Sequence, residues 1–136
     1  MANNRKRGHD AERYYAKVFY DMGFTFCKTS RLASRLLDNC KVDLYGLPYN
    51  IQVKGGKHKN LNPRRVLNQM RELLALNFPP HDPVHSYPSF IIHRRMIYSN
   101  QNDDDIVYYL KDNKLIKTDF KSLKTRIEND KSQQSV

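Results

Sequence analysis

The sequence lacks any long apolar stretch and has very few cysteines. No segment of its 136 residues approaches the roughly 20 apolar residues that a membrane-spanning helix needs. The first ten residues, MANNRKRGHD, include basic side chains with no apolar run behind them, so we do not expect a signal peptide. The two cysteines, Cys27 and Cys40, match no zinc-binding spacing and are expected to be reduced thiols. These absences predict a protein that works in the cytoplasm.

Acidic residues are also in short supply. Fourteen Asp and Glu stand against 24 Lys and Arg, which gives a formal net charge of +10 and a pI of about 9.7. A small domain with this excess of positive charge is typical of proteins that bind a polyanion such as nucleic acid. The alternative is that the charge only keeps the protein soluble. Charge alone does not distinguish cutting a nucleic acid from binding it.

Length and composition favour one domain with a modest core. Hydrophobic residues make up 39% of the chain and charged residues 28%, which leaves little room for a second domain. We predict a single domain over residues 1–136, divided into a basic arm at 1–9, a core at 10–100, and an appended hairpin and tail at 101–136.

The spacing of apolar residues predicts an α/β fold. Ala11, Tyr15 and Phe19 belong to an apolar stripe with helical spacing, which predicts a helix from about Asp10 to a stop at Gly23. Further elements are predicted in this order: a strand at 24–28, a basic loop or helical turn at 29–35, a hairpin at 42–54, a helix at 62–76, a strand at 89–98, a hairpin at 106–118, and a short helix from 120, with a disordered end at 132–136.

The hairpin at 42–54 carries the most informative residues. A four-residue turn at 46–49 would place Asp43 directly opposite Gln52, with both side chains on one face and their Cβ atoms about 5 Å apart. Lys54 would point from the same face. A shift of one residue would move the apolar neighbours into water, so the hydrophobic pattern supports this register.

This set of side chains suits metal-dependent phosphodiester hydrolysis. Mg²⁺ prefers hard oxygen ligands and uses only one or two carboxylates. We expect Asp43 and Gln52 to be direct ligands, the carbonyl of Val53 a third, and Glu12 a ligand through water. The ammonium of Lys54 would position the attacking water or stabilise the transition state. Taken singly, an acid at a strand end or a polar strand residue is as easily structural.

Three segments carry a resemblance to a known superfamily: Gly8 to Glu12, Val42-Asp43, and Gln52-Val53-Lys54. In this order and spacing they resemble the PD-(D/E)xK nuclease superfamily, whose core is αβββαβ. The opening Arg5-Lys6-Arg7-Gly8-His9-Asp10-Ala11-Glu12-Arg13 is similar to that of archaeal-type Holliday junction resolvases, and the likeness continues through Gly23-Phe24 and the serine-containing segment 30–34. The resemblance covers about residues 5–95.

The resemblance implies a restriction-endonuclease-like fold, with a mixed central sheet flanked by helices and a small C-terminal extension. It implies a Mg²⁺-dependent endodeoxyribonuclease, with Mn²⁺ as a substitute metal, whose partners are branched DNA and a second copy of the chain. A phage-encoded version would act in the host cytoplasm. Glu12, Asp43, Gln52 and Lys54 would be the catalytic residues.

The sequence departs from the family pattern at Gln52, where an acid is usual. An amide oxygen still ligates metal but brings no charge. Mrr-type restriction endonucleases resemble this QxK pattern, although they carry a separate DNA-binding domain for which this chain has no room. The second departure is the region 103–136, for which we expect a role in dimerisation or substrate binding.

Basic and hydroxyl side chains around the predicted site are expected to contact DNA phosphates. They are Arg5, Lys6, Arg7, Ser30, Arg31, Ser34, Arg35, Lys57 and Lys59. The alternatives are a flexible basic tail, a solvated loop, and serines that cap helices or turns. His81 and His85 lie in a proline-rich loop without a pattern of partner carboxylates, and we do not expect them to bind metal.

Three functions remain open from the sequence. The first is a homodimeric Holliday junction resolvase, because paired nicks need two active sites and a two-fold dimer supplies them. The second is a restriction-like or repair endonuclease that acts on duplex DNA. The third is a catalytically inactive DNA-binding protein with the same fold. The chemistry of the first two is the same, so residue types do not separate them.

Overall fold

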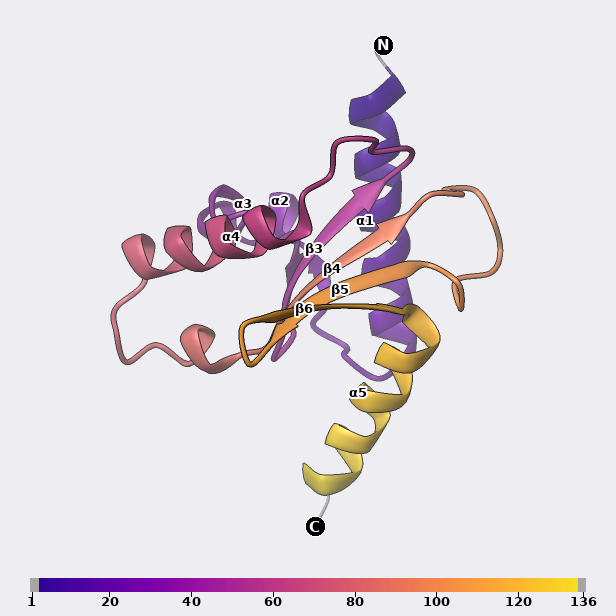
Figure 1. The fold of residues 1–136 in the computed structure, drawn as a ribbon. Helices are drawn as coiled ribbons and strands as arrows, with labels where there is room; N and C mark the ends of the chain where they lie inside the picture. The colour runs from indigo at the N-terminus through magenta and orange to yellow at the C-terminus, as the bar shows by residue number, and fades with distance from the viewer. Residues whose placement is uncertain (1–2, 135–136) are drawn as a thin grey trace.

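A mixed four-stranded sheet forms the centre of the molecule in a computed structural model that describes residues 3–134 (Figure 1). In order across the sheet, the strands are β3 (Asn50–Gly55), β4 (Ser89–Arg94), β5 (Ile106–Lys111) and β6 (Lys114–Asp119). β3 and β4 are parallel, and the other pairs are antiparallel. The predicted α/β class, with a mixed sheet flanked by helices, is confirmed.

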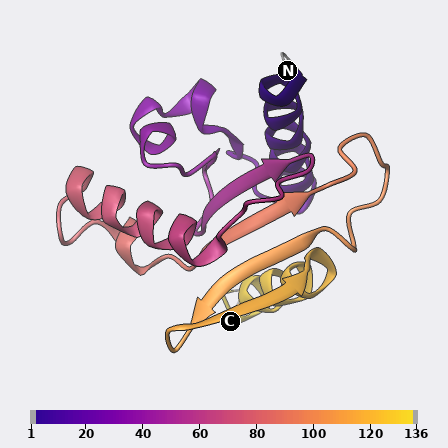
Figure 2. The same cartoon turned by 45° about the horizontal axis from the view of Figure 1, so that its top comes forward.

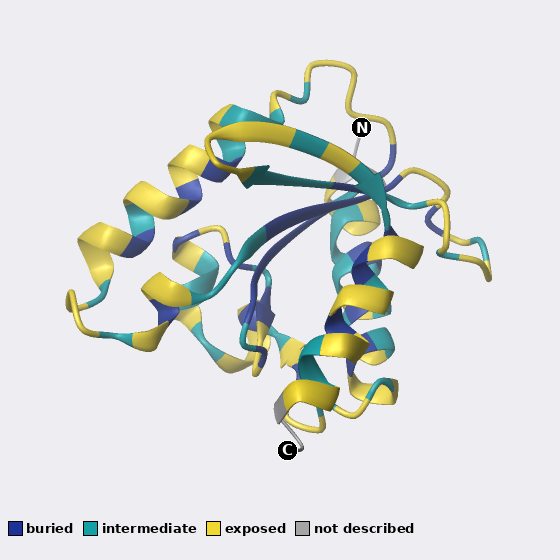
Figure 3. Ribbon diagram, turned by 60° about the horizontal axis from the view of Figure 1, so that its bottom comes forward, coloured by how far each residue is buried: buried dark blue, intermediate teal, exposed yellow. Residues whose placement is uncertain are grey.

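Helices bury apolar side chains on both faces of this sheet. α1 (Asn3–Asp21) and α5 (Phe120–Gln134) pack on one face, and α4 (Pro63–Asn77) packs on the other, as a second view shows (Figure 2). Ala11, Tyr15 and Phe19 of α1 are fully buried because their four-residue spacing directs them to one side of the helix. Buried positions follow the sheet and the inner stripes of the helices (Figure 3). Each large apolar side chain buried there stabilises the fold by about 1.5–3 kcal/mol.

The parallel pair is joined through α4 and a 3-10 turn, η1 (Pro83–Ser86), since a parallel connection must cross from one end of the sheet to the other. Asn62 caps α4 by accepting a hydrogen bond from the Arg65 N–H at 3.1 Å, and a proline occupies the first turn. The predicted helix at 62–76 therefore agrees with α4 to within one residue.

α1 begins well before the predicted start at Asp10. Residues 3–9, expected to form a basic arm, are the first turns of this helix, and Gly8 lies inside it. Glycine costs a helix about 0.5–1 kcal/mol relative to alanine, which disfavours helix around Gly8 and is consistent with the predicted start at Asp10. The packing of α1 against β3 overrides it.

The hairpin predicted at 42–54 is not a regular β ladder. β2 (Leu44–Tyr45) pairs with β1 (Lys28–Thr29) in a separate two-stranded sheet, and the partner of β3 is β4. The strand predicted at 24–28 is reduced to the start of β1. Two short helices, α2 (Ser30–Ala33) and α3 (Arg35–Asn39), form the predicted helical turn between β1 and β2.

The C-terminal region is not an appendage. β5 is hydrogen-bonded to β4, so the 106–118 hairpin extends the central sheet. α5 buries Phe120, Leu123 and Ile127 in the same cluster as α1. The helix runs to Gln134, which contradicts the disorder expected from residue 132, and residues 135 and 136 lie outside the described part of the chain. The local pattern at 106–118 indicates a hairpin, but it does not show that β5 also pairs with β4 across the loop at 95–105.

A buried arginine fixes the loop between β4 and β5. Arg94 is fully buried, and its guanidinium pairs with Asp105 at 2.9 Å. It also donates hydrogen bonds to the carbonyls of Ile97 (3.1 Å), Gln101 (3.0 Å) and Ser99. A buried charge is tolerated only when its donors are satisfied, so these contacts hold the loop in one conformation. Among residues 3–134, no helix is both long and apolar enough to cross a membrane.

Two glycine-to-alanine substitutions should have opposite effects on stability. A Cβ on Gly55 would lie 2.6 Å from the Arg7 carbonyl oxygen and 2.8 Å from the Ala11 Cβ, where α1 crosses β3. Gly55→Ala should therefore lower the free energy of unfolding by about 1–3 kcal/mol. A Cβ on Gly8 meets nothing within 4 Å, so Gly8→Ala should raise that free energy by about 0.5–1 kcal/mol. Urea unfolding of both variants measures this. An unchanged stability for Gly8→Ala would show that the first turns of α1 are not helical in solution.

Candidate active site

Asp43 connects the small sheet to the central sheet. Its backbone N–H donates to the Ile51 carbonyl at 2.8 Å, and its carbonyl accepts from the Ser30 N–H at 2.8 Å. Its carboxylate oxygen Oδ2 accepts from the Val53 N–H at 2.8 Å. These bonds hold Asp43 beside Ile51 and Val53, the two neighbours of Gln52 on β3, but no ladder pairs Asp43 with Gln52, so the predicted register stays a prediction. The carboxylate thus takes the position that a backbone carbonyl would have in a regular hairpin.

The environment of Asp43 favours its protonated form. Burial and the nearby negative charge of Glu12 raise the pKa of Asp43 to about 8, against the opposing effects of the Val53 N–H and of Lys54. Within residues 3–134, the second carboxylate oxygen, Oδ1, accepts no hydrogen bond. A partly buried acid with a free oxygen and a strongly raised pKa is a frequent feature of functional sites.

Gln52 holds a buried oxygen without a partner. The residue is 7% exposed, and its side-chain oxygen Oε1 receives no hydrogen bond within the described chain. Leaving a buried acceptor unsatisfied costs about 1–3 kcal/mol. Such an atom in a well-packed strand points to a ligand that completes its coordination.

The carbonyl of Val53 faces the same edge of β3 as Asp43. An extended residue directs its N–H and its carbonyl to the same side of the strand, and the Val53 N–H points to Asp43. β4 occupies the opposite edge of β3. The oxygens of Asp43, Gln52 and Val53 therefore come from adjacent positions on two neighbouring segments.

Lys54 follows at the next position on the same face of β3 as Gln52, because strand side chains alternate. It is partly buried and forms no ion pair among residues 3–134. Its positive charge acts on Asp43, whose pKa it lowers against the effect of burial. The ammonium is therefore close to the carboxylate and is not neutralised by a carboxylate partner.

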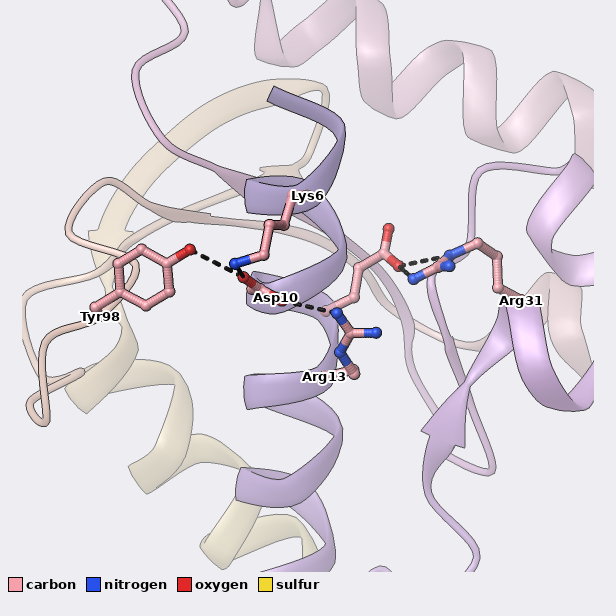
Figure 4. Close-up of polar contacts among 6 residues, drawn as sticks. Lys6, Asp10, Arg13, Arg31 and Tyr98 are labelled. Atoms are coloured by element: carbon pink, nitrogen blue, oxygen red, sulfur yellow. Dashed lines mark hydrogen bonds and ion pairs between the residues drawn. The ribbon is translucent and has the colours of Figure 1, made fainter. Parts of the chain in front are cut away.

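Glu12 is held by an arginine that the sequence analysis assigned to DNA. Arg31 of α2 donates from Nε at 3.2 Å and from a terminal nitrogen at 3.1 Å to one carboxylate oxygen of Glu12 (Figure 4). The Glu12 side chain is 13% exposed, and that of Arg31 is 34% exposed. The pair joins α1 to α2 beside Asp43. No spacing rule could have found it, since 19 residues separate the two.

The donor set fits a hard divalent cation. No group of three or more His, Cys, Asp and Glu side chains suited to a metal occurs among the described residues. The oxygens that meet here are of other kinds, namely one carboxylate, one amide and one backbone carbonyl, with Glu12 close to the first. Mg²⁺ accepts such mixed oxygen ligands and keeps several waters. The unsatisfied Oε1 of Gln52 is the observation that supports this fit.

The residues predicted to contact DNA phosphates lie in different environments. Arg5, Lys6, Arg7, Arg35, Lys57 and Lys59 are exposed, although Lys6 is paired with Asp10 at 3.5 Å. Ser30 is fully buried, which argues against the predicted contact. Ser34 caps α3 by accepting from the Leu37 N–H at 3.3 Å, which is the structural alternative. His85 hydrogen-bonds to the Pro79 carbonyl at 2.9 Å.

The sequence analysis missed His93 next to the site. It is 5% exposed, pairs with Lys54 in the parallel register, and hydrogen-bonds to the Gly56 carbonyl at 2.6 Å. Burial lowers its pKa, so the neutral ring is favoured. Only the strand pairing brings residues 54 and 93 together.

In comparisons with known proteins, no family model, no curated protein and no solved structure matches this chain. The geometry of the site therefore carries the functional argument.

We expect the stability of the metal-free protein to depend on Asp43 ionisation. The pKa is about 8 in the folded state and about 3.9 in an unfolded chain. Between these values the folded state binds the extra proton, so the contribution of Asp43 to stability falls as pH rises and levels off above about 8. Asp43→Asn keeps an acceptor for the Val53 N–H but cannot ionise.

Thermal unfolding in EDTA across this pH range tests the prediction. The melting temperature of Asp43→Asn should rise relative to the wild-type protein as pH increases, and the gap should stop widening near pH 8. The contributions of groups that titrate in both proteins cancel in this difference between melting temperatures. Parallel profiles would show that Asp43 is already ionised at low pH.

Proposed function

We propose that the protein is a metal-dependent DNA endonuclease that hydrolyses phosphodiester bonds. The observation that carries the proposal is the buried, unpaired Oε1 of Gln52, next in the chain to Val53, whose N–H donates to the carboxylate of Asp43. Lys54, on the same face and without an ion-pair partner among the described residues, supplies the cation that such chemistry requires. The net charge of +10 suits a DNA substrate.

Each residue has a role that follows from its position. Asp43 Oδ1, Gln52 Oε1 and the Val53 carbonyl would hold Mg²⁺ or Mn²⁺, and Glu12 would contribute through water. The chemistry that the metal supplies when bound is a lowered pKa of a coordinated water and charge neutralisation on the phosphate. The Lys54 ammonium would orient the water or stabilise the developing negative charge.

The order α1, β1, β2, β3, α4, β4 is the basis for proposing a restriction-endonuclease-like core. It agrees with the αβββαβ resemblance when the short strands β1 and β2 are both counted with β3 and the short helices α2 and α3 are set aside. The short β1–β2 sheet is bound to β3 through Asp43 and not through a ladder. This arrangement keeps the metal-binding edge of β3 free of a full neighbouring strand.

We propose a four-way DNA junction as the substrate, cut by a homodimer during recombination or repair. A two-fold dimer would present two equivalent sites to two backbones of a branched molecule. The alternative of a duplex-specific restriction-like or repair enzyme has the same site chemistry. The neutral Gln52 favours one further candidate, a DNA-binding protein without catalytic activity, because a charged ligand is absent from this position.

Substitutions at the two ligand positions should separate these candidates. Asp43→Asn should abolish cleavage and leave DNA affinity nearly intact, because it removes the charged ligand and keeps the hydrogen bond to Val53. Gln52→Glu should keep or raise activity, since it adds a second charged ligand. Cleavage of a labelled four-way junction, with and without Mg²⁺, measures both.

Asp38→Asn is the matched control. Asp38 lies in α3 and is close enough to affect the pKa of Asp43, but it is outside the proposed ligand set. Its variant should cut normally. Retention of more than a few per cent of activity in Asp43→Asn would contradict the assignment of Asp43 as a metal ligand. Complete loss in Gln52→Glu would mean that the amide's donor group is required, and a wild-type protein that binds but never cuts would support the inactive candidate.

Junction recognition and salt dependence give an independent prediction. Affinity should be higher for a four-way junction than for linear duplex of equal length, because recognition would rest on phosphates and DNA shape. Replacing Arg5, Lys6 and Arg7 together by Gln should flatten the slope of log K against log salt by roughly two to three units. Equal affinity for both DNAs, with cutting at one fixed sequence, would favour the restriction-like alternative.

A further inference from the structure

Two exposed side chains, Met96 and Tyr98, border a basic hollow in the loop that follows β4. This hollow, of about 460 Å³, is lined by the cations Arg7, Lys57 and Arg95 and by the apolar side chains Met96, Ile97 and Tyr98. Met96 is 73% exposed and Tyr98 is 70% exposed. No acidic side chain of residues 3–134 lines it. We call it the basic hollow.

Tyr98 is exposed and yet held in place. Its hydroxyl donates to the Asp10 carboxylate of α1 at 2.9 Å, and the Lys6 ammonium lies 5.9 Å from the ring centroid (Figure 4). Asp10 is itself paired with Lys6 at 3.5 Å and with Arg13 at 2.7 Å. A large ring that is fixed before binding loses little entropy when a ligand stacks on it.

The loop that carries these side chains is fixed from beneath. Arg94 is fully buried and bonds to the carbonyls of Ile97, Ser99 and Gln101 and to Asp105. Its guanidinium also stacks on the ring of Tyr14, with its carbon 3.6 Å from the centroid. The buried core of the loop explains why Met96 and Tyr98 face outward, since the interior positions are already filled.

We propose that the basic hollow binds an unpaired nucleotide of DNA. A nucleobase offers a flat apolar surface for Tyr98 and Met96, and its phosphates offer partners for Arg7, Lys57 and Arg95. Aromatic and cationic side chains in this combination are characteristic of single-strand binding. The volume suits a small ligand. A neighbouring hollow of about 420 Å³ shares Lys57, Arg95 and Met96 but includes Asp104 and Asp105, which makes it less suited to phosphate.

The basic hollow lies close to the proposed catalytic residue Lys54. Gly56, which lines it, is two residues beyond Lys54, or about 7 Å along an extended strand. The loops after β3 and β4 and the first half of α1 lie at the same end of the sheet (Figure 1). The inference deepens the proposed function and rests on it for its biological role: an unstacked base at a branch point would be captured beside the cleaved phosphate.

Binding of fluorescent oligonucleotides in EDTA tests the inference without cleavage. The probes are a single-stranded oligonucleotide, a blunt duplex and a four-way junction, each followed by fluorescence anisotropy at fixed ionic strength. Tyr98→Ala should weaken single-strand binding by about fivefold or more, the effect expected for losing one stacked base. Tyr98→Phe keeps the ring and loses only the bond to Asp10, so it should stay within about twofold of wild type.

Three further variants distinguish the loss of a contact in the basic hollow from a general loss of structure. Met96→Ala removes an exposed side chain that makes no hydrogen bond, and it should also weaken single-strand binding. Arg95→Ala should reduce the salt slope for single strands by about 0.7. Leu76→Ala is the control, since Leu76 is 81% exposed on α4 and does not line the basic hollow. Its affinity for every probe should equal that of wild type.

The outcomes separate this inference from the proposed function. Loss of single-strand and junction binding in Tyr98→Ala and Met96→Ala, with blunt-duplex binding unchanged, supports it. Unchanged single-strand affinity in both variants overturns it, as does an equal loss on blunt duplex. If the wild-type protein cuts no DNA but its single-strand binding depends on Tyr98, the inference stands and the endonuclease proposal falls. Normal cleavage without any dependence on Tyr98 overturns the inference alone.

Discussion

The structure depends on how Asp43 is bound to β3. Its N–H, its carbonyl and its carboxylate bond to Ile51, Ser30 and Val53, so one residue joins α2, the β1–β2 sheet and the central sheet. A regular hairpin would have used a backbone carbonyl where this site uses a carboxylate. The exchange leaves the second carboxylate oxygen without a hydrogen bond among residues 3–134, and Gln52, the neighbour of Val53, holds an unpaired amide oxygen. The hydrogen bond from the Val53 N–H to the Asp43 carboxylate therefore joins the two sheets and also orients the proposed metal ligand.

This double use has an energetic cost in the free protein. Burial raises the pKa of Asp43 to about 8, and the unpaired oxygen of Gln52 adds a desolvation penalty. A cation at this position would offset both, because it favours the ionised carboxylate and completes the coordination of the amide oxygen. The metal-free protein is therefore destabilised at the position where cation binding would remove the two costs. The pairing of Glu12 with Arg31 limits the accumulation of negative charge there.

Arg94 organises the other side of the site in a comparable way. Its buried guanidinium replaces water as the partner of three loop carbonyls and of Asp105. A charge in this position is stable because each of the three guanidinium nitrogens has a partner. The result is a rigid loop that presents exposed side chains next to the end of β3. α1 contributes to both sides, through Glu12 toward Asp43 and through Asp10 toward Tyr98.

Local pattern was sufficient for much of this protein. The apolar stripe of α1, the Asn62 cap of α4 and the turn at Asp112-Asn113 are set by residues close in sequence, and each lies where the sequence placed it. The alternation along β3 likewise put Gln52 and Lys54 on one face. Tertiary structure decided what depends on distant partners: β3 pairs with β4, β5 extends the central sheet, and α1 continues through Gly8 to Asn3. The contacts of Glu12 with Arg31, of Lys54 with His93, and of Arg94 with its loop join segments that no local periodicity relates. Periodicity reports which face of an element is apolar, whereas partner choice follows from packing and from the need to satisfy buried polar groups.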